Sequence, residues 1–213
     1  PATLLAAGAL ATALPSELRW DVVNDTVMGG RSTGRAVDLG GGGVRFEGDL
    51  SLESNGGFAS VRSAGARVPL DGGQGLRVTV LGDGRVWMLT LRRADVPIRG
   101  GSYRAAIETT AGEVTTHDLA WSDFAASSFG RPLPTAPPIS GGLDRIASIG
   151  LLLADKQPGP FAVELQAVAR LSAAPERSGG GDGGSVDVGQ RDRLKSSFAA
   201  ALRQGVPAFN AGR

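Results

Sequence analysis

Short apolar stretches separated by glycine-rich turns make up most of the chain between Val22 and Leu171. In several of them apolar and polar residues alternate, as at Leu76, Val78 and Val80, so that one set of side chains shares a face. We predict strands over residues 36–39, 44–50, 58–62, 76–81, 86–92, 102–108, 114–119, 146–153 and 161–171. Many short strands with glycine-rich connections are typical of an all-β protein with a β-sandwich fold.

Two segments depart from this pattern. Residues 121–142 include prolines 132, 134, 137 and 138, which predict an extended loop suited to an interaction surface. Residues 172–187 are rich in glycine and indicate a flexible linker. Beyond the linker, residues 188–213 predict a short helix, from about 188 to 203, followed by a tail. The helix would carry an apolar stripe formed by Leu194, Phe198 and Leu202.

The N-terminal segment is apolar as well. Residues 2–14 carry no charge, but they are too few to cross a bilayer as a helix. They resemble the apolar part of a signal peptide without its basic start. We expect residues 1–17 to form an ordered arm that packs on the domain or on a partner, with the sandwich itself over residues 18–171.

Charge and residue usage exclude several classes of function. The chain has 22 basic and 21 acidic residues, so no global field would attract nucleic acid. It has no cysteine, which excludes disulfides, thiol catalysis and zinc–thiolate sites. The single histidine, His117, has no nucleophile-elbow motif to work with. The glycine runs at 40–43 and 179–184 lack the strand–turn–helix context of a nucleotide site. We therefore predict a non-enzymatic protein without a cofactor.

Residues 20–32 form the most detailed motif, Trp-Asp-Val-Val-Asn-Asp-Thr-Val-Met-Gly-Gly-Arg-Ser. Asn24 and Asp25 can hydrogen-bond nearby backbone, and the glycines at 29–30 permit positive φ. We interpret the motif as a rigid turn, with Met28 packed beneath the Asn-Asp corner.

Two further stretches accompany it. In residues 46–63, Asn55-Gly56-Gly57 predicts a tight hairpin turn with positive φ, and Phe58 after it is expected in the core. In residues 149–161, Asp155-Lys156-Gln157 predicts a polar hairpin tip. Taken in this order and spacing, the three blocks resemble the CIA30 family, that of complex I intermediate-associated protein 30. The resemblance covers approximately residues 18–171.

The resemblance implies a galactose-binding-like jelly roll. It also implies a protein-interaction role, as an accessory subunit or assembly factor of a respiratory or photosynthetic membrane complex. The partners would then be protein subunits of that complex, and the protein would sit at the membrane surface without spanning the bilayer, on either side. The apolar stripe of the predicted helix and the N-terminal arm could both contact such subunits.

The three blocks define the expected interaction surface. Its residues are Asn24, Asp25, Met28, Ser32, Asn55, Phe58, Asp155, Lys156 and Gln157. A second expected surface is the apolar stripe of the C-terminal helix, which would otherwise fold back on the sandwich.

Two alternatives remain open at this stage. A jelly roll could serve as a carbohydrate-binding module, with Trp87, Tyr103, Trp121 and Phe129 available to stack on sugar rings. Loop oxygens could also hold a structural Ca²⁺, because this cation accepts carboxylate and amide ligands. The residues considered for that site are Asn24, Asp25, Asn55 and Asp155.

Overall fold

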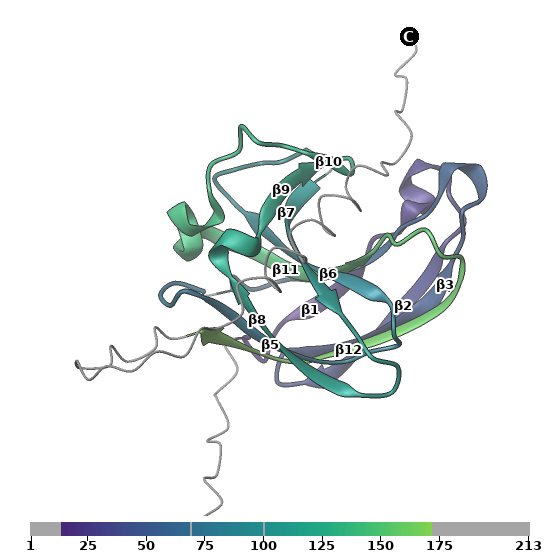
Figure 1. Cartoon of the computed structure of the whole chain (residues 1–213), viewed down its shortest axis with the longest axis horizontal. Coiled ribbons are helices and arrows are strands. Elements are labelled where there is room, and N and C mark those ends of the chain that lie inside the picture. Colours follow the sequence, from purple (N-terminus) through teal and green to yellow (C-terminus); the bar gives the residue numbers. More distant parts are fainter. Residues whose placement is uncertain (1–13, 69, 100, 172–213) are drawn as a thin grey trace, which may run out of the picture.

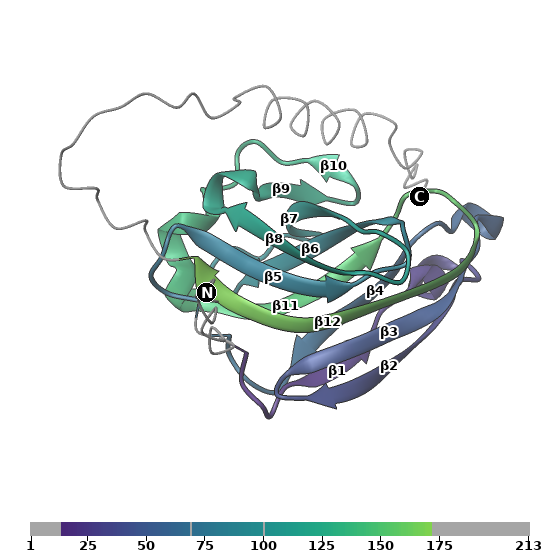
Figure 2. The same cartoon turned by 60° about the horizontal axis from the view of Figure 1, so that its bottom comes forward.

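The computed structural model describes residues 14–68, 70–99 and 101–171, and these residues form two packed antiparallel β-sheets (Figures 1 and 2). The seven-stranded sheet has the order β1 (Arg19–Val22), β4 (Ala59–Ala64), β11 (Ile146–Leu153), β6 (Val86–Arg93), β7 (Gly101–Glu108), β9 (Ala125–Ser128) and β10 (Arg131–Pro132). The five-stranded sheet has the order β2 (Thr33–Gly40), β3 (Gly43–Leu50), β12 (Gly159–Leu171), β5 (Gly75–Leu81) and β8 (Val114–Ala120).

Four short 3-10 helices lie in the connections. They are η1 (Asp25–Met28), η2 (Glu53–Asn55), η3 (Trp121–Asp123) and η4 (Ile139–Arg145). Among the described residues, no helix is long and apolar enough to cross a membrane.

Alternating side chains build the core between the sheets. On β5, Leu76, Val78 and Val80 are completely buried, while the residues between them are partly exposed. The same alternation runs along β6 through Trp87 and Leu89. Each sheet therefore turns one apolar face toward the other, which confirms the all-β sandwich predicted from periodicity.

Three aromatic rings join the two sheets inside the core. Phe46 of β3 and Phe161 of β12 lie with their ring centroids 5.0 Å apart. Trp87 of the opposite sheet approaches both edge-on, at 6.1 Å and 5.7 Å. The indole Nε1 of Trp87 donates to Asp83 Oδ1 at 3.0 Å, so its one polar group is satisfied. This cluster fixes the stacking of the sheets.

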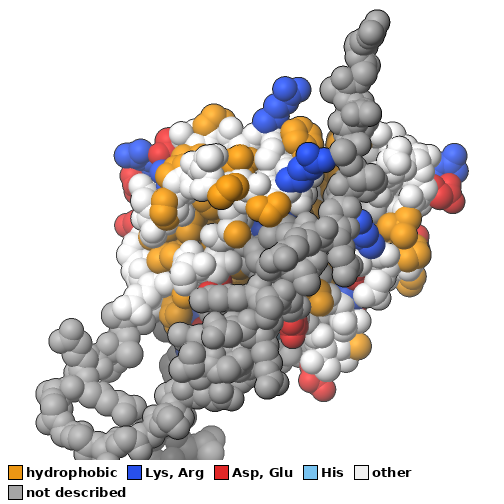
Figure 3. Space-filling view, turned by 45° about the horizontal axis from the view of Figure 1, so that its top comes forward, with side chains coloured by type: hydrophobic (Ala, Val, Ile, Leu, Met, Phe, Trp, Pro, Cys, Tyr) orange, Lys and Arg blue, Asp and Glu red, His pale blue; other side chains and the backbone are white. Residues whose placement is uncertain are grey.

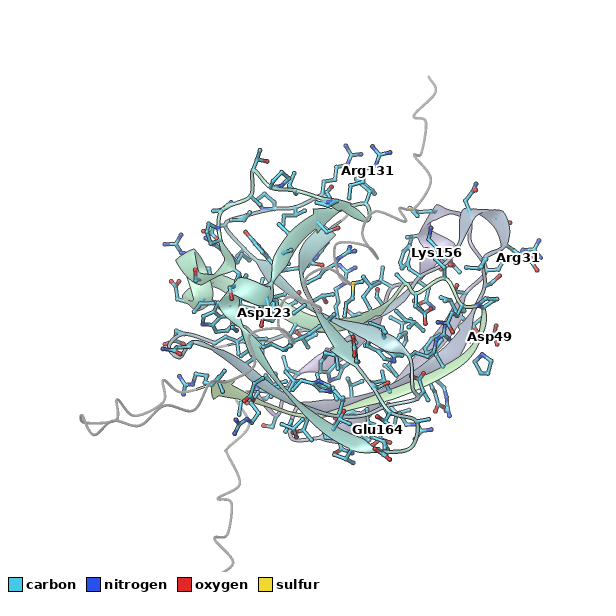
Figure 4. The ribbon with its side chains drawn as sticks, viewed as in Figure 1. Arg31, Asp49, Asp123, Arg131, Lys156 and Glu164 are labelled. Carbon is cyan, nitrogen blue, oxygen red and sulfur yellow. The ribbon has the colours of Figure 1, made fainter. Side chains whose placement is uncertain are left out.

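The connections mostly cross from one sheet to the other instead of forming hairpins. The chain changes sheet between β1 and β2, between β3 and β4, and between β11 and β12. Register places all three crossings at one end of the sandwich, because Leu153 pairs with Ala59 and Gly159 pairs with Leu50. Arg31 and Lys156, from two of these crossings, are both visible at that end (Figure 4).

The nine strands predicted from sequence are all present, with shifts of a few residues at some ends. Three predictions about connections are wrong. Residues 121–142 contain η3, β9 and β10, so they do not form one irregular loop. Residues 55–57 and 155–157 lie in crossings between sheets, so neither is a hairpin tip. The predicted linker and C-terminal helix, with residues 1–13 of the arm, fall outside the described residues.

The aromatic cluster generates a stability prediction. Phe46→Ala should lower the free energy of unfolding by about 3–5 kcal/mol, because it leaves a cavity beneath Trp87 and Phe161. Urea denaturation followed by tryptophan fluorescence measures this loss. Val37→Ala is the control: Val37 is 39% exposed on β2, so its replacement should change stability by less than about 0.5 kcal/mol. Similar losses in the two variants would contradict the central role of the cluster.

Candidate functional site

The carboxylate of Asp25 is the centre of the motif corner, which we define as residues 24–32 together with the facing crossing 51–58. Asp25 is completely buried, and no cation pairs with it among the described residues. Its Oδ1 accepts the backbone N–H of Ser32 at 2.9 Å, and its Oδ2 accepts the Ser32 hydroxyl at 2.5 Å. Oδ2 also accepts the backbone N–H groups of Gly57 at 2.7 Å and Phe58 at 3.3 Å. These donors replace the water that the charge loses on burial.

Asn24 and Ser32 extend this network. The Asn24 amide accepts the backbone N–H of Ser60 at 3.2 Å and donates to the Ser32 carbonyl at 3.4 Å. The Ser32 hydroxyl also accepts the backbone N–H of Ser51 at 3.0 Å. Both side chains are buried. The crossing that leaves β1 is thereby tied to the one that leaves β3.

Glycines allow the backbone to close around the carboxylate. A Cβ at Gly30 would lie 2.4 Å from Cγ of Asp25, and one at Gly56 would lie 2.7 Å from its Oδ2. Gly29 and Gly57 have the expected positive φ, +90° and +121°. Gly30 does not, so the expectation of positive φ there is wrong, and close approach to Asp25 explains that glycine instead.

The outer side of the corner is apolar. Val27 is 69% exposed and Met28 is 45% exposed on η1, and Leu52 is 43% exposed on the facing crossing. Hydrophobic side chains gather at this end of the molecule, at the right of Figure 3. Met28 therefore faces solvent and does not pack beneath the corner as predicted. An exposed ion pair, Arg31 with Glu53 at 2.9 Å, joins the two crossings beside it.

Asp155 lies in the third crossing and is held by an arginine. Arg85 donates to its two carboxylate oxygens at 2.9 Å and 2.7 Å. Arg85 also donates to the backbone carbonyl groups of Gln157 and Pro160. Both charged side chains of the pair are largely buried. This bidentate pair fixes the crossing, and Lys156, Gln157 and Pro158 at its tip are exposed.

The structure divides the predicted surface into two groups. Asn24, Asp25 and Ser32 are buried, so they hold the corner and cannot themselves contact a partner. Asp155 is engaged by Arg85, and Phe58 is half-buried instead of fully in the core. The exposed members are Met28, Asn55, Lys156 and Gln157.

The considered Ca²⁺ site does not match this geometry. The oxygens of Asp25 face N–H and O–H donors, and those of Asp155 face a guanidinium. No group of three or more His, Cys, Asp or Glu side chains suited to a metal ion occurs in the described part of the chain. The corner is therefore a hydrogen-bonded anchor, not a cation cage.

His117 lies on β8 with its Nε2 2.9 Å from Oγ1 of Thr115. Burial lowers its pKa, and the negative charge of Glu108 opposes that shift in part. Within the part of the chain that is described, no carboxylate is hydrogen-bonded to His117, and its partner Thr115 is not arranged with it as a triad. Its geometry is that of a strand residue sharing a hydrogen bond with its neighbour.

Sequence comparison identifies the family. The profile of "Complex I intermediate-associated protein 30 (CIA30)" matches residues 11–165. The chain belongs to the CIA30 family. The expectation raised by the three sequence blocks is thus confirmed. No curated protein matches the chain significantly.

Solved structures with a similar fold include carbohydrate-binding modules. The family 11 carbohydrate-binding module of the cellulosomal cellulase Lic26A-Cel5E of Clostridium thermocellum has a TM-score of 0.52 and 16% identity, covering 79% of this chain and 96% of the module. A family 11 module from the same organism, in complex with a β-1,3-1,4-mixed-linked tetrasaccharide, has a TM-score of 0.46 and 17% identity, covering 72% and 91%. The first similarity shows that the CIA30 domain has the predicted galactose-binding-like jelly-roll fold.

Sequence reasoning missed the exposed Val27 and Leu52, and it missed the partners of Asp155. Val27 is part of the motif, so its apolar side chain could have been noted from the sequence. Its exposure could not be inferred, because that depends on which neighbouring residues are buried. Arg85 is 70 residues from Asp155 in sequence, and no local pattern links them. Sequence reasoning also missed Arg62 and Arg92 on the outer face of the seven-stranded sheet, because only the pairing of their strands with β11 brings them together.

The buried carboxylate predicts a large effect of a small change. Asp25→Asn should lower the free energy of unfolding by about 2–3 kcal/mol, because an amide NH₂ would face N–H donors and the charge-assisted bonds would be lost. Urea denaturation measures the change. Asp49→Asn is the matched control, since Asp49 is exposed on β3 (Figure 4) and should shift stability by less than about 0.5 kcal/mol. Equal effects of the two substitutions would be incompatible with an anchoring role for Asp25.

A second ion cluster predicts acid sensitivity. The guanidinium of Arg93, hydrogen-bonded to Asp95 at 3.0 Å and 2.7 Å, lowers the pKa of that carboxyl well below its usual range, and Arg145 assists. Because the folded-state pKa is depressed, the stabilisation is complete above about pH 4 and is lost as the pH falls toward the folded-state value. Asp95→Asn should therefore lower the melting temperature at pH 7. The gap to wild type should narrow below about pH 4, and a gap that stayed constant down to pH 2 would contradict this account.

Proposed function

We propose that this CIA30 domain is a non-enzymatic protein-interaction module that serves a membrane electron-transfer complex, as an assembly factor or accessory subunit. The observation that carries the proposal is the family match over residues 11–165, since the family is named for association with an intermediate of complex I. The complex would be respiratory or photosynthetic, and the protein would associate with the membrane from its surface.

The motif corner is the contact surface that we propose. Its buried polar residues stiffen two crossings, and its outward side presents apolar Val27, Met28 and Leu52. Exposed apolar side chains on a stiff support suit a protein partner, because burying them is favourable and little conformational entropy is lost. The exposed pair Arg31–Glu53 would lie at the rim of such a contact.

Burial of the aromatic residues weighs against the carbohydrate-binding alternative. Trp87 and Tyr103 are at most 1% exposed, and Trp121 is 9% exposed, so their rings are not available to stack on a sugar. Of the four aromatic residues considered, Phe129 alone is exposed, at 53%. Stacking on sugars needs ring faces open to solvent. The fold similarity to carbohydrate-binding modules therefore supports the fold and not this function.

Co-purification tests the proposal and predicts its site. Tagged full-length protein, isolated in mild detergent from membranes of its native host, should bring down subunits of a redox complex. Val27→Asp should reduce this recovery about tenfold, because burying one valine contributes about 1.5 kcal/mol. Its melting temperature should not change, since the side chain is exposed.

Val114→Asp is the matched control, because Val114 is 57% exposed on β8, away from the corner. It should leave recovery within about twofold of wild type. Equal loss in both variants would argue against the corner. Recovery of no redox subunit, combined with retention on a glycan column, would overturn the proposed function. Deletion after Arg177 tests separately the predicted stripe of Leu194, Phe198 and Leu202.

A further inference from the structure

A pocket of about 430 Å³ opens on the seven-stranded sheet where β6, β7 and β11 meet the connection 94–99. Four arginines line it, Arg62, Arg92, Arg93 and Arg99, and no acidic residue does among the described residues. Arg93 is neutralised by Asp95, as described above. The other three arginines form no ion pair within the described part of the chain.

Strand register explains why these side chains converge. One row across the sheet, which includes Val61, Leu151 and Leu89, is buried against the core. The next row, Arg62, Gly150, Thr90 and Arg104, must therefore point to the outer face. Arg92 belongs to the following outward row, beside Ser148. Gly150 lies between Arg62 and Thr90 in this row, where a Cβ would come within 3.0 Å of both of these neighbours.

The arginines are held in place by neutral groups. Arg92 donates to the backbone carbonyl of Gly101 at 2.9 Å and 2.6 Å, and Arg104 donates to the hydroxyl of Ser102 at 3.2 Å. These contacts orient the guanidinium groups but leave their charge uncompensated. The side chain of Arg62 forms no hydrogen bond with another described residue, so it is available to a ligand.

Electrostatics agrees with this geometry. Burial, together with the positive charge of Arg92, lowers the pKa of Arg104 to about 10. Burial likewise lowers the pKa of Arg92, and the charge of Arg62 adds to that shift. Like charges brought together at a partly buried site destabilise one another, and an anion bound between them would relieve this repulsion.

Polar groups suited to an oxyanion lie in the same place. The hydroxyl groups of Ser102 and Ser148 line the pocket and are largely buried. Ser127 pairs with Ser102 in the sheet, so it shares the outward face, and it is only 1% exposed. Its Oγ has no hydrogen-bond partner in the described structure. Ser127 is not part of the pocket lining, so Ser102 and Ser148 are the hydroxyl groups that could contact a ligand there.

We propose that this pocket binds a phosphate group, with Arg62, Arg92 and Arg99 supplying the positive charge. Guanidinium groups form bidentate hydrogen bonds with phosphate oxygens, and three unpaired cations match the multiple charge of a phosphate ester. A soluble phosphate ester and a phospholipid headgroup carry the same chemistry. The site is separate from the motif corner and does not rest on the proposed protein-interaction role.

Calorimetric titration of the full-length protein with inorganic pyrophosphate tests the site. Binding should weaken as salt is raised, and Arg62→Gln should lower the affinity at least about tenfold, because it removes one charged hydrogen-bonding group. The side chain of Arg62 forms no hydrogen bond or ion pair with the described residues, so the Arg62→Gln variant should keep the wild-type melting temperature without ligand. Arg62→Lys retains the charge, so its affinity for pyrophosphate should lie between those of the wild type and the Arg62→Gln variant.

Arg170→Gln is the matched control, because it removes the same charge from an exposed position on β12, in the other sheet. Its affinity should stay within about twofold of wild type. Flotation with phosphatidylcholine vesicles, with and without phosphatidic acid, then separates the two sources. If the protein floats with phosphatidic acid vesicles, and the Arg62→Gln substitution or added pyrophosphate prevents this, the ligand is a lipid headgroup. If the protein binds pyrophosphate but does not float, the ligand is a soluble ester. Absence of both, or equal loss in the Arg62→Gln and Arg170→Gln variants, would overturn the proposal.

Discussion

A buried carboxylate without a cation is the constraint on which the motif corner depends. Burial removes the carboxylate of Asp25 from water, and part of the lost hydration is replaced by backbone N–H groups of a crossing more than 30 residues away. The β1–β2 and β3–β4 crossings must therefore approach each other to hydrogen-bonding distance. The glycines at 30 and 56 follow from this, because any side chain there would occupy the space of the carboxylate.

The same constraint divides the motif into two sets of residues. One set is buried and holds the two crossings together, and the other faces solvent. Polar members such as Asn24 and Ser32 lie inside, where their hydrogen bonds are satisfied by the chain itself. Apolar Val27 and Met28 lie outside, on the short helix η1. This inverts the usual distribution of polar and apolar residues at a protein surface. A stiff loop that exposes apolar side chains is costly to a protein in isolation, which is why we place the partner contact there.

Sequence patterns predicted the strands well and their connections poorly. The alternation at Leu76, Val78 and Val80 shows that these side chains lie on one face of a strand. This depends only on local strand geometry, so it holds in any sandwich topology. The turn residues at 55–57 also report only local backbone. They cannot distinguish a hairpin from a crossing, because both need a reversal of the chain. Which strand comes next in space is decided by packing between sheets, and that depends on distant residues such as Phe46 and Trp87.

The site was predictable to a similar degree. The family resemblance singled out the residues of the corner, but the inward direction of Asp25 and the outward direction of Met28 follow from hydrogen bonds across the two crossings. The arginine pocket could not be predicted, because Arg62 and Arg92 come together only through their separate pairings with β11. Each is an ordinary polar residue of an alternating strand when read alone.

The arginine pocket differs from the other buried charged groups of the described structure in lacking a compensating partner. Asp25 accepts hydrogen bonds from backbone N–H groups and from Ser32, Asp155 pairs with Arg85, and Arg93 pairs with Asp95 and donates to a backbone carbonyl. Wherever the described structure buries one of these charges, it also supplies the compensating group. The outer row of arginines breaks this pattern, because burial lowers the pKa of Arg92 and Arg104 without a nearby carboxylate. A fold that compensates its other buried charges so completely leaves these arginines for a charge that comes from outside the sandwich, and an anion is the ligand that supplies it.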